Sequence, residues 1–300
     1  MRWGVVGRGI CAAVVGVLMM GAVGGCGRPG GRTGGKAGQQ EVRQIGSTTV
    51  LPLAEKWHRE FNKEHPEISI SVSGGGSGTG INALIAGTAE IANSSRAIKP
   101  KEVEQARAAG VNPVEHVVAH DGIAVIVHPS NPVGELSVEH LSDIFSGVVT
   151  NWEMVGGPAE EIQVVSRDSA SGTYEAFKDL VVTMQGKDRS REYAAAALKQ
   201  GSNQAVLALV GNTKAAIGYV GLGYVDESVK TLGVIPMGQR EAVAPTVDNV
   251  MSGEYPVSRA LYCYTNGDPT GTVKQYLDWA KGPEGQAIVA EFGFVPVGAK

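Results

Sequence analysis

Apolar and polar positions along the chain follow two alternating periods. Short apolar runs predict strands at 42–45, 68–72, 123–127, 162–165, 216–220 and 261–264. Between them, Leu53, Trp57 and Phe61 recur at i, i+4 and i+8 and give a helix over 51–63 one apolar face. Further helices are predicted at 81–86, 172–184, 191–199, 204–212 and 272–281. Strands that alternate with helices predict an α/β fold in which parallel sheets are covered by helices.

Three of the predicted strand-to-helix junctions are rich in Ser, Thr and Gly, at 46–49, 74–80 and 167–173. A helix start leaves backbone N–H groups without partners and carries the positive end of the helix dipole, while hydroxyl groups add donors and Gly allows close approach. A single junction of this kind is typical of simple helix capping. The repetition, together with Arg167 at the head of the third junction, favours a cage for one small oxyanion.

The positions of the junctions predict how the chain is divided. In open α/β sheets the ligand crevice lies beyond the carboxyl ends of the strands. The third junction follows the first two only after the apolar run 121–127, so we expect two lobes that face a shared cleft. The predicted first lobe combines residues 41–120 with 258–300, and the predicted second lobe is 121–257. Binding would close the two lobes about a hinge.

The N-terminal residues predict export. Two early arginines precede an apolar run over 10–23, which is shorter than the roughly 20 residues that span a bilayer. The peptide Val-Gly-Gly-Cys that follows resembles the bacterial lipobox, in which the cysteine receives lipid before cleavage. We therefore expect a signal peptide at 1–25, lipid on Cys26 and a flexible tether at 26–40. The protein is then expected outside the cytoplasm, held to a membrane by its lipid.

Composition narrows the function classes. The 300 residues include 26 basic and 30 acidic ones, so nucleic-acid binding is not expected and an anion must be held by local donors. Of the three cysteines, Cys11 is expected to leave with the signal and Cys26 to be lipidated, which would leave Cys263 without a disulfide partner. His116 and His120 have the spacing of a zinc pair on a helix, but their surroundings are strand-like and predict ordinary polar residues. We expect a monomer that uses no metal and no cofactor.

Several peptides, in order, resemble the phosphate-binding proteins of bacterial ABC transporters, the PstS family: GSTTVLPLAEKW, GGGSGTGINALIAGTAEIANSSRAI, DIFSGVVTNWEMVGG, VVSRDSASGTYEAF, AIGYVGLGYV, YPVSRALYCYT and EGQAIVAEFGFVPV. The resemblance covers about residues 42–298. It implies a two-lobed periplasmic-binding-protein fold of type II, with two mostly parallel sheets and an interlobe ligand cleft. It also implies capture of inorganic phosphate outside the cytoplasmic membrane and delivery to an ABC transporter permease.

The resemblance also implies a set of phosphate-binding residues: Thr48, Thr49, Ser77, Ser95, Arg167, Ser171, Gly172 and Thr173. Ser95 is a departure, because some family members place there an aspartate that accepts the proton of bound phosphate. Asp168 and Asp121 are the two candidates for a replacement acceptor. Their alternative roles are an ion-pair partner for Arg167 and a turn residue at a strand end. Arg96 either contacts the anion or holds the loop that carries Ser95.

Two other functions stay open. The same fold could serve a sensor or a binder of sulfate, molybdate or tungstate, since these anions need similar donors. A phosphate-ester hydrolase could also use a cradle of hydroxyl groups, but the chain has no G-x-S-x-G elbow, and its six histidines lie away from the junctions. We therefore expect a binding protein that is not an enzyme.

Overall fold

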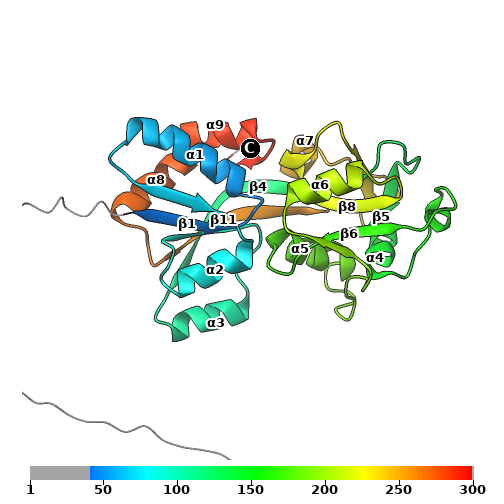
Figure 1. Ribbon diagram of the computed structural model, residues 1–300, viewed down its shortest axis with the longest axis horizontal. Helices are drawn as coiled ribbons and strands as arrows, with labels where there is room; N and C mark the ends of the chain where they lie inside the picture. The colour runs from blue at the N-terminus through cyan, green and yellow to red at the C-terminus, as the bar shows by residue number, and fades with distance from the viewer. Residues whose placement is uncertain (1–40, 299–300) are drawn as a thin grey trace, which may run out of the picture. The chain divides into compact units, whose positions relative to one another are not determined.

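The computed structural model describes residues 41–298, which form a mixed sheet covered by helices on both faces (Figure 1). The main sheet has ten strands. Its path runs through β2 (Ile70–Ser73), β1 (Val42–Gly46), β3 (Ile91–Ser94), β11 (Ser258–Asn266), β4 (Pro113–Val127), β8 (Ala216–Gly221), β6 (Gln163–Arg167) and β7 (Leu198–Gln200). The short strands β9 (Lys230–Thr231) and β12 (Val295–Pro296) also pair with β4, and β5 (Glu135–Ser137) pairs with β10 (Gly233–Ile235).

Strand β4 joins the two lobes. Its 15 residues pair with β11 over most of their length and with β8 over the last five, from Ile123 to Val127. Both pairings are antiparallel, whereas β1 is parallel to β2 and β3, and β6 is parallel to β7 and β8. The two sheets expected from the sequence are thus the ends of one sheet, because a single strand is long enough to serve both lobes. The residue boundaries of the lobes stay a prediction.

The first lobe packs its helices on both faces of β1, β2 and β3. Helices α1 (Leu51–Glu64), α8 (Gly271–Lys281) and α9 (Pro283–Glu291) cover one face, and α2 (Ser77–Ile85) and α3 (Pro100–Ala108) lie toward the other (Figure 1). The predicted apolar face of α1 is confirmed, since Leu53, Trp57 and Phe61 are fully buried. The Trp57 indole N–H also donates to the Gly285 carbonyl at 2.8 Å, which ties α1 to α9. This packing fixes the start of α1, where the first junction lies.

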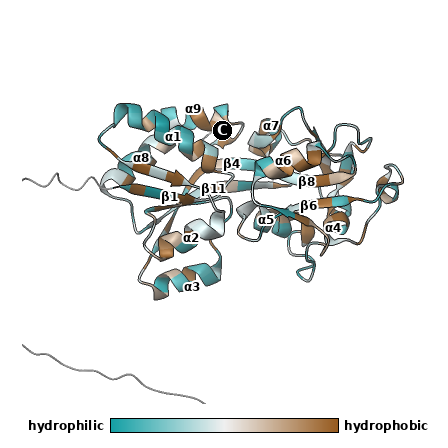
Figure 2. Cartoon of the chain, viewed as in Figure 1, coloured by the Kyte–Doolittle hydropathy of each residue, from teal (hydrophilic) through white to brown (hydrophobic). Residues whose placement is uncertain are grey.

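The second lobe surrounds β8, whose six residues are all buried. Figure 2 shows this strand as largely apolar, whereas the outward side of a surface helix such as α1 is hydrophilic. The helices of this lobe are α4 (Val138–Ser146), α5 (Gly172–Phe177), α6 (Asn203–Gly211) and α7 (Val247–Met251). Phe177 of α5 stacks on Tyr219 of β8, with ring centroids 4.0 Å apart. This stacking anchors α5, which follows the third junction.

Two predicted helices differ in the structure. The helix expected over 172–184 is α-helical only to Phe177 and continues as a π-helix, η2 (Lys178–Val182). The helix expected over 191–199 is wrong, because its last residues form β7, in which Leu198 pairs with Val165. The alanines of this segment have high helix propensity, but they form a turn in which the Ala194 N–H donates to the Phe145 carbonyl, and the residues that follow pair with β6. The helices predicted at 204–212 and 272–281 are confirmed as α6 and α8.

Two further observations concern the expected export signal and anchor. In the range 41–298, no helix combines the length and apolarity that crossing a bilayer requires. The expected signal peptide at 1–25, the lipidated Cys26 and the tether at 26–40 lie outside the described residues.

Candidate anion-binding site

The second and third junctions touch each other directly. The Gly78 N–H, at the start of α2, donates to the Ala170 carbonyl at 3.1 Å. Gly172 at the start of α5 is packed so closely that an added Cβ would lie 2.3 Å from Ser77 Oγ and 2.5 Å from Ser95 Oγ. A side chain at 172 would force these two serine hydroxyls to move, so glycine permits this approach of the two lobes. The Gly-rich composition of the junctions serves backbone contact between lobes.

A cluster of buried serine hydroxyls lies on the first-lobe side. The Ser47 hydroxyl donates to Ser95 Oγ at 3.0 Å, and the oxygens of Ser77 and Ser95 are 3.4 Å apart. The backbone N–H of Ser95 donates to Ser77 Oγ at 3.0 Å. All three side chains are fully or almost fully buried. The cluster therefore gathers hydroxyl groups from the ends of β1 and β3 and the start of α2.

Thr49 is one of the residues through which the first junction meets the second lobe. Its Oγ1 lies 3.0 Å from Thr173 Oγ1 and accepts from Asn203 Nδ2 at 3.2 Å. Ser171 caps α5, since its Oγ accepts from the backbone N–H groups of Thr173 and Tyr174. A threonine hydroxyl between these elements can turn its proton to either side, so Thr49 can donate to a ligand or accept within the protein.

Arg167 supplies a buried positive charge at the end of β6. Its guanidinium donates to four neutral oxygen atoms within the described residues: Gln200 O, Gly201 O, Asn203 Oδ1 and Thr48 Oγ1. The side chain is fully buried, and this burial lowers the pKa of the guanidinium. An arginine keeps its proton even so, because its ordinary pKa is above 12. A buried cation bonded to neutral acceptors attracts an anion.

A buried ion pair lies where the lobes join. Arg259 of β11 faces Asp121 of β4 in the antiparallel register, and its Nε and Nη2 donate to Asp121 Oδ2 at 3.1 and 2.8 Å. The Leu222 N–H donates to Asp121 Oδ1 at 3.0 Å. Burial raises the pKa of the Asp121 carboxyl, and the Arg259 charge opposes that rise. Arg259 Nη2 also reaches Thr49 Oγ1 at 3.4 Å, which links the pair to the first junction.

The structure brings most of the sequence-predicted residues together: Thr48, Thr49, Ser77, Ser95, Arg167, Ser171, Gly172 and Thr173, with Asp121 beside them. Asp168 is partly exposed, and its Oδ1 accepts from the Ala170 N–H at 3.0 Å, within its own loop. Arg96 forms a bidentate ion pair with Glu102, at 2.8 and 2.6 Å, so it holds the loop after Ser95.

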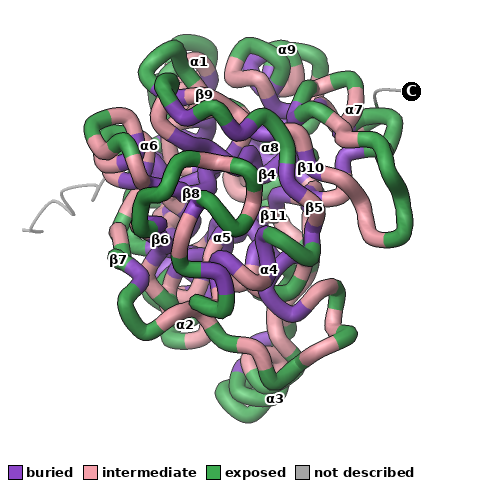
Figure 3. Tube along the Cα trace, turned by 90° about the vertical axis from the view of Figure 1, so that its right-hand side faces the viewer, coloured by how far each residue is buried: buried purple, intermediate pink, exposed green. Residues whose placement is uncertain are grey.

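Sequence reasoning missed four residues of this region: Ser47, Asn203, Tyr224 and Arg259. The Tyr224 hydroxyl donates to the Thr48 carbonyl at 2.6 Å, and Asn203 is the first residue of α6, one position before the helix predicted over 204–212. Arg259 lies in the peptide YPVSRALYCYT, which contributed to the family resemblance but was given no role there. These residues come from four separate segments, so no local spacing connects them. All residues of β8 and the last seven of β4 are buried (Figure 3).

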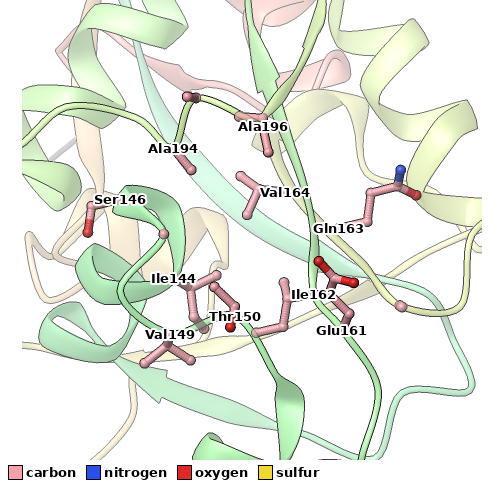
Figure 4. Close-up of a pocket in the computed structure, with 14 residues that line it drawn as sticks. Ile144, Ser146, Val149, Thr150, Glu161, Ile162, Gln163, Val164, Ala194 and Ala196 are labelled. Atoms are coloured by element: carbon pink, nitrogen blue, oxygen red, sulfur yellow. The ribbon is translucent and has the colours of Figure 1, made fainter.

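Other features of the described residues lie apart from this site. A pocket of about 640 Å³ opens near the beginning of β6 (Figure 4), with Ile144, Val149, Ile162 and Val164 among its lining residues. None of its lining residues belongs to the candidate site. Within residues 41–298, no group of three or more His, Cys, Asp or Glu side chains could hold a metal ion.

The comparisons with known proteins agree on one family. The PBP superfamily domain matches residues 31–284. The phosphate-binding protein PstS of Bacillus subtilis (strain 168) is 33% identical over 254 residues, which cover 84% of this chain and 79% of that protein. The PstS of Borreliella burgdorferi is 32% identical over 255 residues, covering 84% of this chain and 88% of that protein.

Solved structures support the same assignment. An ABC transporter substrate-binding protein from Clostridium perfringens, crystallised with bound phosphate, has a TM-score of 0.77 at 32% identity, covering 86% of this chain and all of that one. An ABC-type phosphate transport receptor from Vibrio cholerae has a TM-score of 0.70 at 31% identity over 86% of this chain. The fold is thus that of a two-lobed periplasmic binding protein of type II. The chain belongs to the PstS family of phosphate-binding proteins.

Proposed function

We propose that this protein captures inorganic phosphate between its two lobes and delivers it to the permease of an ABC transporter. The observation that carries the proposal is the buried Arg167 guanidinium, which lies among hydroxyl groups of both lobes and hydrogen-bonds neutral oxygens within the described residues. The relatives named above are phosphate-binding proteins, and one was crystallised with phosphate. Charge-assisted donors and buried hydroxyls are the groups that recognise a tetrahedral oxyanion.

We propose Thr48, Thr49, Ser77, Ser95, Arg167, Ser171, Gly172 and Thr173 as the phosphate-binding residues, with Asp121 as the acceptor of the phosphate proton. A carboxylate oxygen has two lone pairs, and Asp121 Oδ1 has one hydrogen bond, from the Leu222 N–H. It keeps the capacity to accept one more. Asp168 is the poorer acceptor, because its carboxylate is partly exposed and already engaged by its own loop.

The alternatives are less favoured by the same contacts. Sulfate, molybdate and tungstate would use the same donors, but a fully ionised anion brings its lone pairs against the Asp121 carboxylate. A hydrolase needs a base that activates a nucleophile. Among residues 41–298, the His116 ring is hydrogen-bonded to Thr265 and the His128 ring to Ser130. Neither partner is a hydroxyl group of the candidate site. We therefore propose a binding protein that is not an enzyme.

Titration of the detergent-solubilised protein, after removal of bound anion by dialysis, tests the proposal. We expect a dissociation constant for phosphate of about 1 μM or tighter, or roughly 8 kcal/mol of binding free energy. Absence of both binding heat and a rise of the melting temperature with phosphate would overturn it.

The proposed location is extracytoplasmic, with the chain anchored as a monomer through lipid on Cys26 after loss of 1–25. The motif Val-Gly-Gly-Cys supports this part of the proposal. Intact-mass analysis of the membrane fraction provides the measurement, and Cys26→Ser is expected to abolish the lipid. An unmodified wild-type chain that begins elsewhere would contradict the anchor without affecting the phosphate site.

A further inference from the structure

Arg259 has a donor that the protein itself does not use. The side chain is 5% exposed and is fixed by two hydrogen bonds to Asp121 Oδ2. Its third nitrogen, Nη1, is buried and has no hydrogen-bond partner among the described residues. An unpaired buried N–H of a charged group is strongly unfavourable, so such a group calls for a partner.

The Arg259 guanidinium lies on the proposed phosphate cage. Its Nη2 is 3.4 Å from Thr49 Oγ1, and that oxygen also meets Thr173 and Asn203 at 3.0 and 3.2 Å. Asn203 connects in turn to Arg167, whose Nη1 donates to Asn203 Oδ1 at 3.2 Å. Two arginines from different strands thus lie around the same threonine and asparagine.

The positive charges of the two arginines repel each other. After burial, the charge of Arg259 is one of the influences that lower the pKa of Arg167. Asp121 compensates for part of the positive charge, since it pairs with Arg259. The charge of Asp168 also acts on Arg167 and opposes the lowering of its pKa, so two carboxylates lie near the two guanidinium groups. A dianion with one proton complements the donors and the acceptor of this set in its hydrogen-bonding pattern.

We propose that Arg259 Nη1 binds the anion directly and that the Asp121–Arg259 pair presents a donor and an acceptor side by side, which selects a protonated tetrahedral oxyanion. This inference rests on the proposed capture of phosphate. Arg259 Nη1 donates to one phosphate oxygen, and Asp121 Oδ1 accepts the hydrogen of the neighbouring P–OH group. Unprotonated sulfate can accept from Arg259 Nη1, but it has no hydrogen to donate to Asp121 Oδ1, and the Asp121 carboxylate repels its charge.

A purely structural salt bridge is the competing explanation. Asp121 and Arg259 are direct neighbours on β4 and β11, so their pairing alone could serve to join the strands. The variant Arg259→Lys separates the two explanations, because lysine keeps the charge but its compact ammonium group lacks the fork that holds Asp121 and a ligand at once. Arg43→Lys is the matched control, since Arg43, which lies on β1, makes a similar bidentate pair with Glu90.

The test is calorimetric titration of full-length wild type, Arg259→Lys and Arg43→Lys with inorganic phosphate and with sulfate. We expect Arg259→Lys to weaken phosphate binding by at least about tenfold and Arg43→Lys to bind within about twofold of wild type. Phosphate affinity of Arg259→Lys within about twofold of wild type would overturn the inference. Failure of the wild type to bind phosphate would instead overturn the proposed function.

A second measurement applies if Arg259→Lys does not fold. A crystal structure of the wild type grown with phosphate is expected to place Arg259 Nη1 at a hydrogen-bond distance from a phosphate oxygen, and Asp121 Oδ1 at such a distance from another. The inference would be contradicted by a structure in which Arg167 and the hydroxyl groups hold the phosphate while Arg259 Nη1 is bonded elsewhere.

Discussion

Arg167 and Thr48 lie 119 positions apart in the chain, yet the Arg167 guanidinium donates to the Thr48 hydroxyl at 2.8 Å. The bond joins the end of β6 in the second lobe to the junction before α1 in the first. It therefore couples the closed arrangement of the lobes to the strongest donor of the proposed site. An anion between these elements would engage the same guanidinium.

This coupling gives the first prediction. Arg167→Ala should weaken phosphate binding by roughly two orders of magnitude, because a hydrogen bond to a charged group contributes about 1.5–3 kcal/mol and arginine can form two. Thr48→Ala should have a much smaller effect, since its hydroxyl is neutral and partly exposed. Calorimetric titration of both variants measures the difference. An Arg167→Ala protein that stays folded and binds phosphate within about twofold of wild type would remove Arg167 from the site.

The carboxylate that reads the phosphate proton gives the second prediction. Asp121→Asn should lower the preference for phosphate over sulfate, because an amide can turn a donor toward a sulfate oxygen. Asp168→Asn should leave the preference unchanged, since Asp168 is bound to its own loop. Competition titrations with the two anions provide the measurement. Equal preferences in wild type and Asp121→Asn would show that Asp121 does not read the proton.

The pH dependence of sulfate binding adds an independent check on Asp121. Above its pKa, which burial raises, the carboxylate repels sulfate. As the pH falls through this pKa, the carboxyl gains a proton and becomes a donor. Sulfate affinity should therefore increase on acidification in the wild type and change little in Asp121→Asn. A wild type whose sulfate affinity is independent of pH would contradict this role.

An ion pair between the two lobes gives the third prediction. Lys99, at the start of α3, lies 2.9 Å from Glu175 of α5, so the pair bridges the two lobes. Lys99→Ala should weaken phosphate binding by about two- to fivefold, which is the range expected for a partly exposed ion pair. The effect of the substitution should be smaller at high salt, because salt screens the pair. Lys101→Ala is the matched control, because Lys101 is an exposed lysine of the same helix. Identical affinities for both variants would show that the ion pair does not stabilise closure.

The local parts of this fold could be predicted from the sequence, and the distant pairings could not. The buried face of α1 follows from the spacing of Leu53, Trp57 and Phe61, and the Ser/Thr/Gly junctions follow from helix-start chemistry. Strand β7 escaped prediction because its pairing with β6 overrides the helix propensity of the alanines before it. The role of Arg259 depends on Asp121, 138 positions away, and no spacing along the chain indicates that contact.

The tight approach of the lobes at Gly172 gives the last prediction. Because an added Cβ would lie 2.3 Å from Ser77 Oγ and 2.5 Å from Ser95 Oγ, Gly172→Ala should hinder closure rather than folding. Rotation of the Ser77 hydroxyl would break the hydrogen bond that its Oγ accepts from the Ser95 N–H. We expect phosphate binding to weaken by at least about tenfold, with the melting temperature of the anion-free protein nearly unchanged.

Gly134→Ala is the matched control for this steric prediction, because an added Cβ at Gly134 meets no atom within 4 Å. It should leave both the melting temperature and its rise with phosphate as in the wild type. Thermal unfolding with and without phosphate separates the outcomes for the two variants. If phosphate raises the melting temperature of Gly172→Ala as much as that of the wild type, the contact between Gly172 and the serine cluster does not form in the anion-bound protein. The site must then close in another way.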